Sequence, residues 1–215
     1  KGTLVLDTVG IIDLDDTNDI YSNTDKAATG ITVNAGVTIK GTQNGQVALG
    51  GKDTYRGTAG GNTYVIMNNN GNIELSGDNS LGIYTNNGII NNYSEVSVTG
   101  KNAAGLFGEN SSVVTNYGNI NISDNGVGIY AVSYQDPGNP DIDFGDGSVN
   151  VTNNGTISVN DSEKAVGIYI NNNKTGAARN TGVLNLSGGI VDMSLSGGSV
   201  GVYTENAAVS GGGTV

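Results

Sequence analysis

A short phrase returns along the chain at nearly regular intervals, and it limits the possible folds more than any other feature. It reads "LGIYTNN" from Leu81, "AGLFGEN" from Ala104 and "VGIYAVS" from Val127. Its glycines are Gly82, Gly105, Gly128, Gly167 and Gly201, which lie 23, 23, 39 and 34 residues apart. A period between about 20 and 50 residues is typical of stacked structural repeats.

A second phrase runs in step with the first and indicates the kind of repeat. It reads "NNGNIEL" from Asn69, "NYGNINI" from Asn116 and "NNGTISV" from Asn153, and apolar and polar residues alternate after the third position. This alternation has the period of a β-strand, whereas glycine or asparagine interrupts every window that could form a helix. We therefore predict an all-β fold, a parallel β-helix (β-solenoid) whose rungs of roughly 23 residues stack about 4.8 Å apart.

Stacked rungs bring the same position of each repeat into a column. The branched residues of the first phrase are expected to stack inside the coil, as Ile83, Leu106, Ile129, Ile168 and Val202. Asparagines at one corner are expected to tolerate a left-handed backbone and to hydrogen-bond to each other from rung to rung. We predict that this ladder consists of Asn70, Asn92, Asn116, Asn154 and Asn180.

Residues 1–215 are expected to form one β-helix unit, and we expect this unit to be a fragment of a longer protein. The longer steps between repeats predict extra residues at a corner, where a solenoid accepts them without disturbing the stack. These loop excursions are predicted near residues 50–62, 133–147 and 171–179.

Several classes of function are excluded by what the chain lacks. Without cysteine and histidine it cannot form disulfides, a thiolate nucleophile, a histidine metal site or a histidine-based triad. Twenty acidic residues against nine basic ones give a net charge of −11, which repels nucleic acid. No apolar run approaches the roughly 20 residues that span a bilayer. We expect a monomer with no cofactor, no nucleic-acid partner and no membrane insertion of this segment.

An aromatic residue follows each inward branched residue of the first phrase. If the branched residue points inward, alternation sends the ring outward into a column on one face. The column would contain Tyr84, Phe107, Tyr130, Tyr169 and Tyr203. Such rings are candidate ligand-binding residues that stack on sugars or form an adhesive surface. The alternative is that they only shield the strand edges and stiffen the stack.

Aspartates gather in "DLDDTND" from Asp13 and in "DIDFGDG" from Asp141. The second segment offers Asp141, Asp143 and Asp146 as candidate calcium ligands, although its spacing matches an EF-hand poorly. A solvated acidic loop is the simpler interpretation. Paired carboxylates also catalyse glycoside hydrolysis, but the basic residues that usually accompany them are scarce here, so we expect no enzymatic activity.

The phrases "NNGTISV", "AVGIYI" and "NYGNINI" resemble the passenger region of large monomeric (type Va) autotransporter adhesins, and most closely the fusobacterial, RadD-like kind. The resemblance covers residues from about Asn34 to Tyr203. It implies a right-handed β-helix on the bacterial cell surface, secreted across the outer membrane. Members of this family attach to host cells or to other bacteria, in some cases through galactose-type sugars and in others in a manner inhibited by arginine. No binding residue of the family can be assigned to a numbered position of this chain.

Three functions remain open on the sequence. The first is an adhesin segment that binds a host-cell glycan, a host surface protein or a partner bacterium. The second is a polysaccharide-degrading β-helix enzyme. The third is a purely structural stalk that holds an adhesive tip away from the cell.

Overall fold

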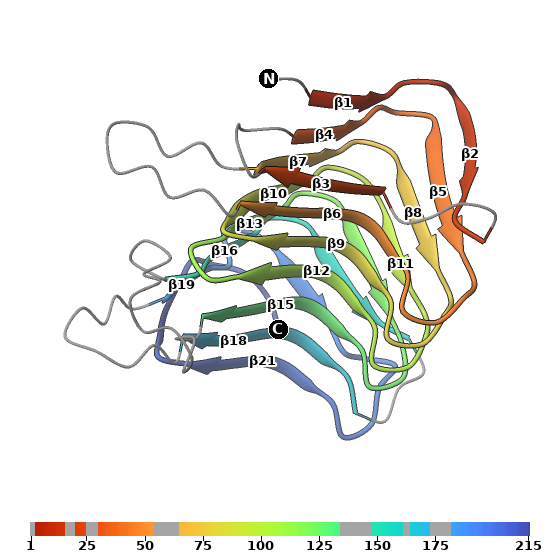
Figure 1. The fold of residues 1–215 in the computed structure, drawn as a ribbon. Helices are drawn as coiled ribbons and strands as arrows, with labels where there is room; N and C mark the ends of the chain where they lie inside the picture. Colours follow the sequence, from red (N-terminus) through yellow and green to blue (C-terminus); the bar gives the residue numbers. More distant parts are fainter. Residues whose placement is uncertain are drawn as a thin grey trace, which may run out of the picture.

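The fold was obtained as a computed structural model, which describes residues 3–15, 20–24, 30–53, 65–133, 148–160, 164–172 and 182–215. Within these ranges all regular secondary structure is β-strand. The strands form three parallel sheets, which we name A, B and C, and the chain winds through them in a right-handed coil (Figure 1). The predicted parallel β-helix is therefore confirmed.

Every coil contributes one strand to each sheet in turn, and each sheet grows by parallel pairing of successive coils. Sheet A contains eight strands, in the order β1 (Thr3–Leu6), β4 (Gly30–Val33), β7 (Val65–Asn69), β10 (Gly88–Asn92), β13 (Val113–Asn116), β16 (Asn150–Asn153), β19 (Gly182–Asn185) and β22 (Ala207–Ser210). Sheet B contains seven, β2 (Gly10–Asp13), β5 (Val37–Gly41), β8 (Asn72–Leu75), β11 (Val96–Val98), β14 (Asn119–Ile122), β17 (Thr156–Val159) and β20 (Ile190–Asp192). Sheet C contains seven, β3 (Ile20–Thr24), β6 (Val47–Asp53), β9 (Leu81–Asn86), β12 (Ala104–Glu109), β15 (Val127–Ser133), β18 (Val166–Asn172) and β21 (Val200–Glu205).

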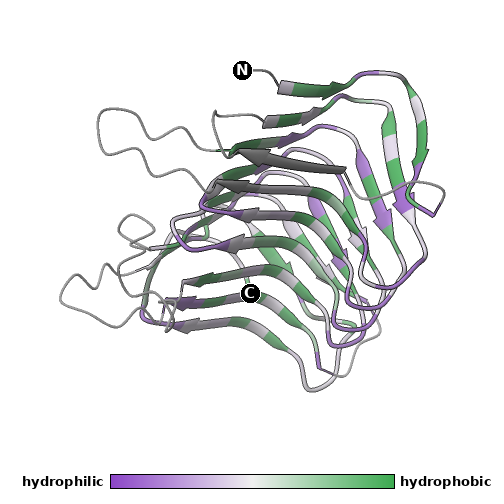
Figure 2. Cartoon of the chain, in the orientation of Figure 1, coloured by the Kyte–Doolittle hydropathy of each residue, from purple (hydrophilic) through white to green (hydrophobic). Residues whose placement is uncertain are grey.

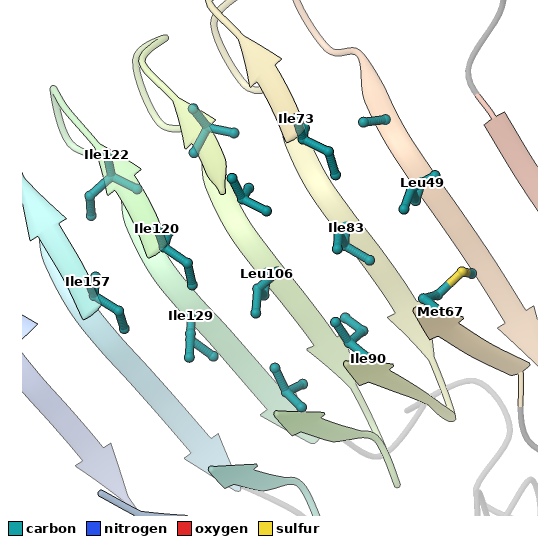
Figure 3. Close-up of a cluster of buried hydrophobic side chains, with 14 of the residues drawn as sticks. Leu49, Met67, Ile73, Ile83, Ile90, Leu106, Ile120, Ile122, Ile129 and Ile157 are labelled. Carbon is teal, nitrogen blue, oxygen red and sulfur yellow. The ribbon is translucent and has the colours of Figure 1, made fainter. Parts of the chain in front are cut away.

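The core is a narrow column of branched aliphatic side chains enclosed by the three sheets (Figure 3). The predicted inward stack is confirmed, because Ile83, Leu106, Ile129 and Ile168 are fully buried and in register. Val202 continues the column but is only partly buried in the last coil. Full burial of one such side chain contributes about 1.5–3 kcal/mol to stability. One aliphatic residue at each inward position is therefore enough to hold each coil on the next.

The recurring glycine has a steric cause. A Cβ atom placed on Gly105 would lie 2.7 Å from the carbonyl oxygen of Gly128 and 2.6 Å from Cγ2 of Ile120. A Cβ on Gly128 would meet Gly167 and Ile157 in the same way, at 2.5 Å from each. The glycine of one coil thus lies against the backbone of the next coil and against an inward side chain of sheet B. A side chain at this position requires the coils to shift, which explains why glycine recurs in β9, β12, β15 and β18, although β6 has Ala48 at the equivalent position.

The asparagine ladder exists, but its register differs by one residue from the prediction in two coils. Asn69, Asn92, Asn116 and Asn153 are each fully buried at the end of a sheet A strand. Each Nδ2 donates to the Oδ1 of the next asparagine, over 2.8, 2.8 and 2.9 Å. The prediction of Asn70 and Asn154 was wrong. In these two coils the strand ends at the first asparagine of "NNG", which is Asn69 or Asn153, and this residue occupies the ladder position. Asn180 lies outside the described residues.

The ladder ends where the sequence no longer supplies asparagine. Val33 occupies the position before Asn69, and the register that pairs Thr152 with Asn185 brings Leu186 to the position after Asn153. Within the ladder, the second amide hydrogen of Asn92 and Asn116 is donated to a carbonyl two residues later. The ladder therefore fixes both the stack and the turn from sheet A to sheet B.

Left-handed asparagines occupy the other two corners, so the corner of the buried ladder was wrongly predicted to be left-handed. Between sheets B and C these residues are Asn79, Asn102 and Asn125, and between sheets C and A they are Asn87, Asn110 and Asn206, with φ between 55° and 58°. At the corner between sheets B and C the two predicted features do occur together, because left-handed Asn102 donates to left-handed Asn79 at 3.4 Å. A short side chain with a local hydrogen-bonding group tolerates this backbone best. Figure 2 shows hydrophilic residues gathered at these turns and hydrophobic residues in the strands.

The longer connections all enter and leave at the corner between sheets C and A, after β6, β15 and β18. The predicted excursions began too early, because residues 50–53, 133 and 171–172 belong to these strands. The pair Gly50–Gly51 suggests a loop by composition, yet a Cβ on Gly51 would lie 2.5 Å from Cγ1 of Val65. Close packing therefore explains the glycine at position 51. The rest of each predicted excursion lies outside the described residues.

Replacing Gly105 with alanine is expected to lower the free energy of unfolding by about 1–3 kcal/mol, because the added methyl group forces two coils apart. The matched control is Gly197→Ala, since a Cβ there has no atom within 4 Å. Urea denaturation of both variants measures the difference. Equal stability of the two variants would contradict the close approach.

Replacing Asn116 with alanine removes both the acceptor for Asn92 and the donor for Asn153. Because two buried polar groups lose a partner, we expect a loss of at least about 2 kcal/mol in urea denaturation. Asn121→Ala is the control, since its hydrogen bond to Glu95 is exposed and should contribute within about 0.5 kcal/mol. A neutral Asn116 variant would mean that the ladder does not stabilise the fold.

Candidate functional site

The five predicted aromatic residues form one continuous column on the outer face of sheet C. Parallel register aligns each ring with the next, from Tyr84 through Phe107, Tyr130 and Tyr169 to Tyr203. The four centroid distances are 5.3, 4.8, 5.1 and 4.9 Å. The predicted outward direction is confirmed, because the rings are half-buried to exposed, whereas the preceding branched residues are buried in four coils and partly buried at Val202.

A local break in alternation positions these rings. In β9 both Gly82 and Ile83 are buried, and Tyr84 is the next residue to face outward. β12, β15 and β18 show the same two consecutive buried residues before the ring. The glycine therefore interrupts the alternation, so that the next residue is buried and the ring after it faces outward. The close approach of the coils and the outward direction of the rings thus have the same origin.

Ring orientation changes along the column. The interplanar angle falls from 61° between Tyr84 and Phe107 to 11° between Tyr169 and Tyr203. The inner pairs are tilted at 51° and 38° with centroids 4.8 and 5.1 Å apart, so neighbouring rings contact one another without face-to-face stacking. Ring edges carry partial positive charge, so they favour contact with oxygen lone pairs.

Two residues after the ring, four of the five strands have a polar side chain, and β15 has Val132. Glu109 accepts hydrogen bonds from the Tyr84 hydroxyl at 2.7 Å and from Asn86 Nδ2 at 2.9 Å. Asn171 donates to Glu205 at 3.0 Å. Between these pairs the surface forms an open depression across three coils, lined by Phe107, Glu109, Tyr130, Val132, Ser133, Tyr169 and Asn171. The depression therefore combines aromatic edges with carboxylate and amide groups that hydrogen-bond to hydroxyls or amides.

Tyr130 lies at the centre of this surface. Burial raises the pKa of its phenol above the ordinary value of 10.0, and the nearby Tyr169 and Glu109 act in the same direction. The phenol therefore stays neutral, and able to donate a hydrogen bond, to a higher pH than an exposed tyrosine does.

The sequence analysis missed a second aromatic pair. Tyr93 and Tyr117 stack at the corner between sheets A and B with centroids 5.0 Å apart and an interplanar angle of 1°. Each is 50% exposed. The signal was present in the sequence, because both residues directly follow the ladder asparagines Asn92 and Asn116.

The candidate calcium ligands Asp141, Asp143 and Asp146 lie outside the described residues, so that prediction remains open. In the other acidic segment, Asp13 pairs with Lys40 at 3.3 Å. Hydrogen bonds, chiefly from Thr42, lower the pKa of Asp15 to about 2. In the part of the chain that the structure describes, no three acidic side chains gather closely enough to hold a metal ion.

Comparison of the chain with protein-family models, with curated proteins and with solved structures finds no match. Among the described residues there is no helix with the length and apolar character needed to cross a bilayer. The candidate site therefore rests on its own geometry.

Tyr130→Phe tests the environment of the central ring. Above about pH 10 the unfolded chain releases the Tyr130 proton before the folded chain does, so wild-type stability falls as pH rises. The variant lacks this contribution, and its melting temperature is expected to improve relative to wild type between about pH 9 and 11. A difference that stays constant over this range would contradict the buried environment of the phenol.

Proposed function

We propose that this chain is a rod-forming segment of a cell-surface adhesin, and that the outer face of sheet C binds a glycan or a surface protein. The observation that carries the proposal is the column of five outward rings, in register over five coils and bordered by Glu109, Asn171 and Glu205. Aromatic bodies beside fixed hydrogen-bonding groups are the usual elements of a recognition surface.

The chemistry of the surface favours a ligand rich in hydrogen-bond donors and without negative charge. In their ionised form, the carboxylates of Glu109 and Glu205 accept hydrogen bonds and cannot donate them. The net charge of −11 would oppose the approach of an anionic ligand. Neutral sugar hydroxyls, or amide and basic groups of a protein, fit these conditions.

At the depression on sheet C, a binding function is favoured over hydrolysis. Glycoside hydrolysis uses two carboxyl groups that flank the scissile bond. Glu109 is the single acidic residue among the described residues that line the depression, and it already accepts hydrogen bonds from Tyr84 and Asn86. We therefore assign the carboxylate a role in positioning the rings and in binding.

The proposed location is the bacterial cell surface, reached by secretion across the outer membrane. A chain that crosses a membrane unfolded benefits from the lack of cysteine, because no disulfide can form before export. Folding coil by coil, mainly through contacts between neighbouring repeats, suits the same route. The resemblance of the repeated phrases to autotransporter adhesin passengers supports this assignment.

A structural stalk is the second candidate. The observation in its favour is that neighbouring rings of the column contact one another with centroids about 5 Å apart, which stiffens the stack without any ligand. In that case the rod would hold a binding element elsewhere in a longer protein, and the outer face of sheet C would be inert.

A glycan array and a binding assay on whole cells test the proposal. Wild type is expected to bind neutral glycans or cells, and Tyr130→Ala is expected to weaken binding about tenfold, which corresponds to roughly 1.4 kcal/mol. Tyr117→Ala is the matched control, because it removes an exposed tyrosine from a different corner. Circular dichroism should confirm that both variants are folded.

The outcomes separate the candidate functions. Binding that is lost in Tyr130→Ala and retained in Tyr117→Ala supports the adhesin surface on sheet C. Release of reducing ends from polysaccharide by wild type would instead indicate an enzyme. No binding and no release would favour the stalk.

A further inference from the structure

The three faces of the rod differ in charge. None of the eight described strands of sheet A contains an acidic or basic residue. The strands of sheets B and C do contain charged residues, among them Asp13, Lys40, Glu74 and Asp192 in sheet B and Glu109 and Glu205 in sheet C. In a chain with a net charge of −11, sheet A is therefore a neutral face.

The outer surface of sheet A consists of two columns in register. The first is mainly aliphatic and contains Ile66, Ile89, Val113, Asn150, Val183 and Ala208. Ile66 is 40% exposed and Val183 is 39% exposed. The second column is uncharged and polar, and contains Thr32, Asn68, Asn91, Thr115, Thr152 and Asn185.

One edge of this face carries the stacked pair of Tyr93 and Tyr117, which directly follow β10 and β13. Tyrosine is enriched and charged residues are depleted in the buried part of protein interfaces. An aliphatic column, an amide and hydroxyl column and an exposed tyrosine pair thus lie together on the one neutral face.

We propose that the outer face of sheet A is a homodimer surface, covered by sheet A of a second copy. Charge selects this occupant. Contacts through sheets B or C would bring acidic residues of two copies together, whereas contact between two A faces brings together uncharged residues. The coil spacing is also the same in both copies, near 4.8 Å, so side chains of one copy can fit between coils of the other along the whole face.

The area of the face sets the strength of the dimer. Eight strands span about 35 Å along the axis, and four residues span about 13 Å across it. Each copy would bury roughly 500 Å², or roughly 1,000 Å² in total, which lies near the lower limit for a specific interface. We therefore expect a reversible dimer that depends on concentration. This differs from the monomer predicted from net charge, because the sequence total does not show that the charges avoid one face.

Sedimentation equilibrium of the full chain between about 1 µM and 1 mM measures the association. Wild type is expected to dimerise within this range. Ile89→Lys places a charge near the middle of the face and should raise the dissociation constant at least about tenfold. Ser97→Lys adds the same charge to the outer face of sheet B and should leave the constant unchanged. A wild type that stays monomeric, or an Ile89→Lys variant that dimerises equally well, would overturn the proposal.

The lack of cysteine provides a second test, because an introduced thiol is unique in the chain. A two-fold axis that passes through the middle of the face, between β10 and β13, brings Thr115 of one copy close to the same residue of the other. Thr115→Cys should therefore yield a cross-linked dimer with a short bis-maleimide, and Ser97→Cys should not. Equal cross-linking of the two variants, or cross-linking through Ser97→Cys alone, would overturn the proposed face. Both tests are independent of glycan binding.

Discussion

The structure depends on the close approach of one coil to the next at the recurring glycine. At Gly105 and Gly128 the backbones approach so closely that a Cβ atom would lie within 2.7 Å of a carbonyl oxygen in the next coil. This contact sets the register of sheet C, and parallel pairing extends the register to sheets A and B. Because every position then lies above its equivalent, identical side chains form columns: aliphatic inside, aromatic outside, and asparagine at the corner. A thin core is sufficient because each coil also gains main-chain hydrogen bonds and buried hydrogen bonds between asparagine side chains from its neighbours.

Much of this fold could be predicted from sequence because the chain repeats its own pattern. The inward column at Ile83 and Leu106 and the outward rings at Tyr84 and Phe107 follow from strand periodicity combined with the repeat. The ladder was misplaced at Asn70 and Asn154 because doubled asparagines offer two equivalent choices, and only backbone register distinguishes them. Gly50 and Gly51 suggested a loop because composition does not distinguish a glycine required for packing from one required for a turn. Tyr93 and Tyr117 were overlooked because they lie outside the strand alternation on which the analysis relied.

The candidate site could be predicted only in part, since chemistry depends on neighbours that sequence does not place. The ring column was visible in the sequence, but the hydrogen bonds of Glu109 to Tyr84 and Asn86 arise from adjacent coils. Net charge likewise conceals the division of the rod into a neutral face and two charged faces. The three long connections also share the corner between sheets C and A, so segments of different lengths enter and leave beside the aromatic face. The rod thus separates a proposed ligand face from a proposed self-association face.

The central claim is that equivalent residues of successive coils are direct neighbours, and a disulfide scan tests it most directly. Ser97 and Asn121 are paired in adjacent strands of sheet B, and Ser158 is one coil further along. Adjacent strands lie about 4.8 Å apart, which a disulfide can bridge, whereas two coils span about 10 Å and cannot be bridged. Mild oxidation is expected to close an intramolecular disulfide in Ser97→Cys/Asn121→Cys and none in Ser97→Cys/Ser158→Cys. Ready closure of the second pair without the first would contradict the stacked register on which the whole account depends.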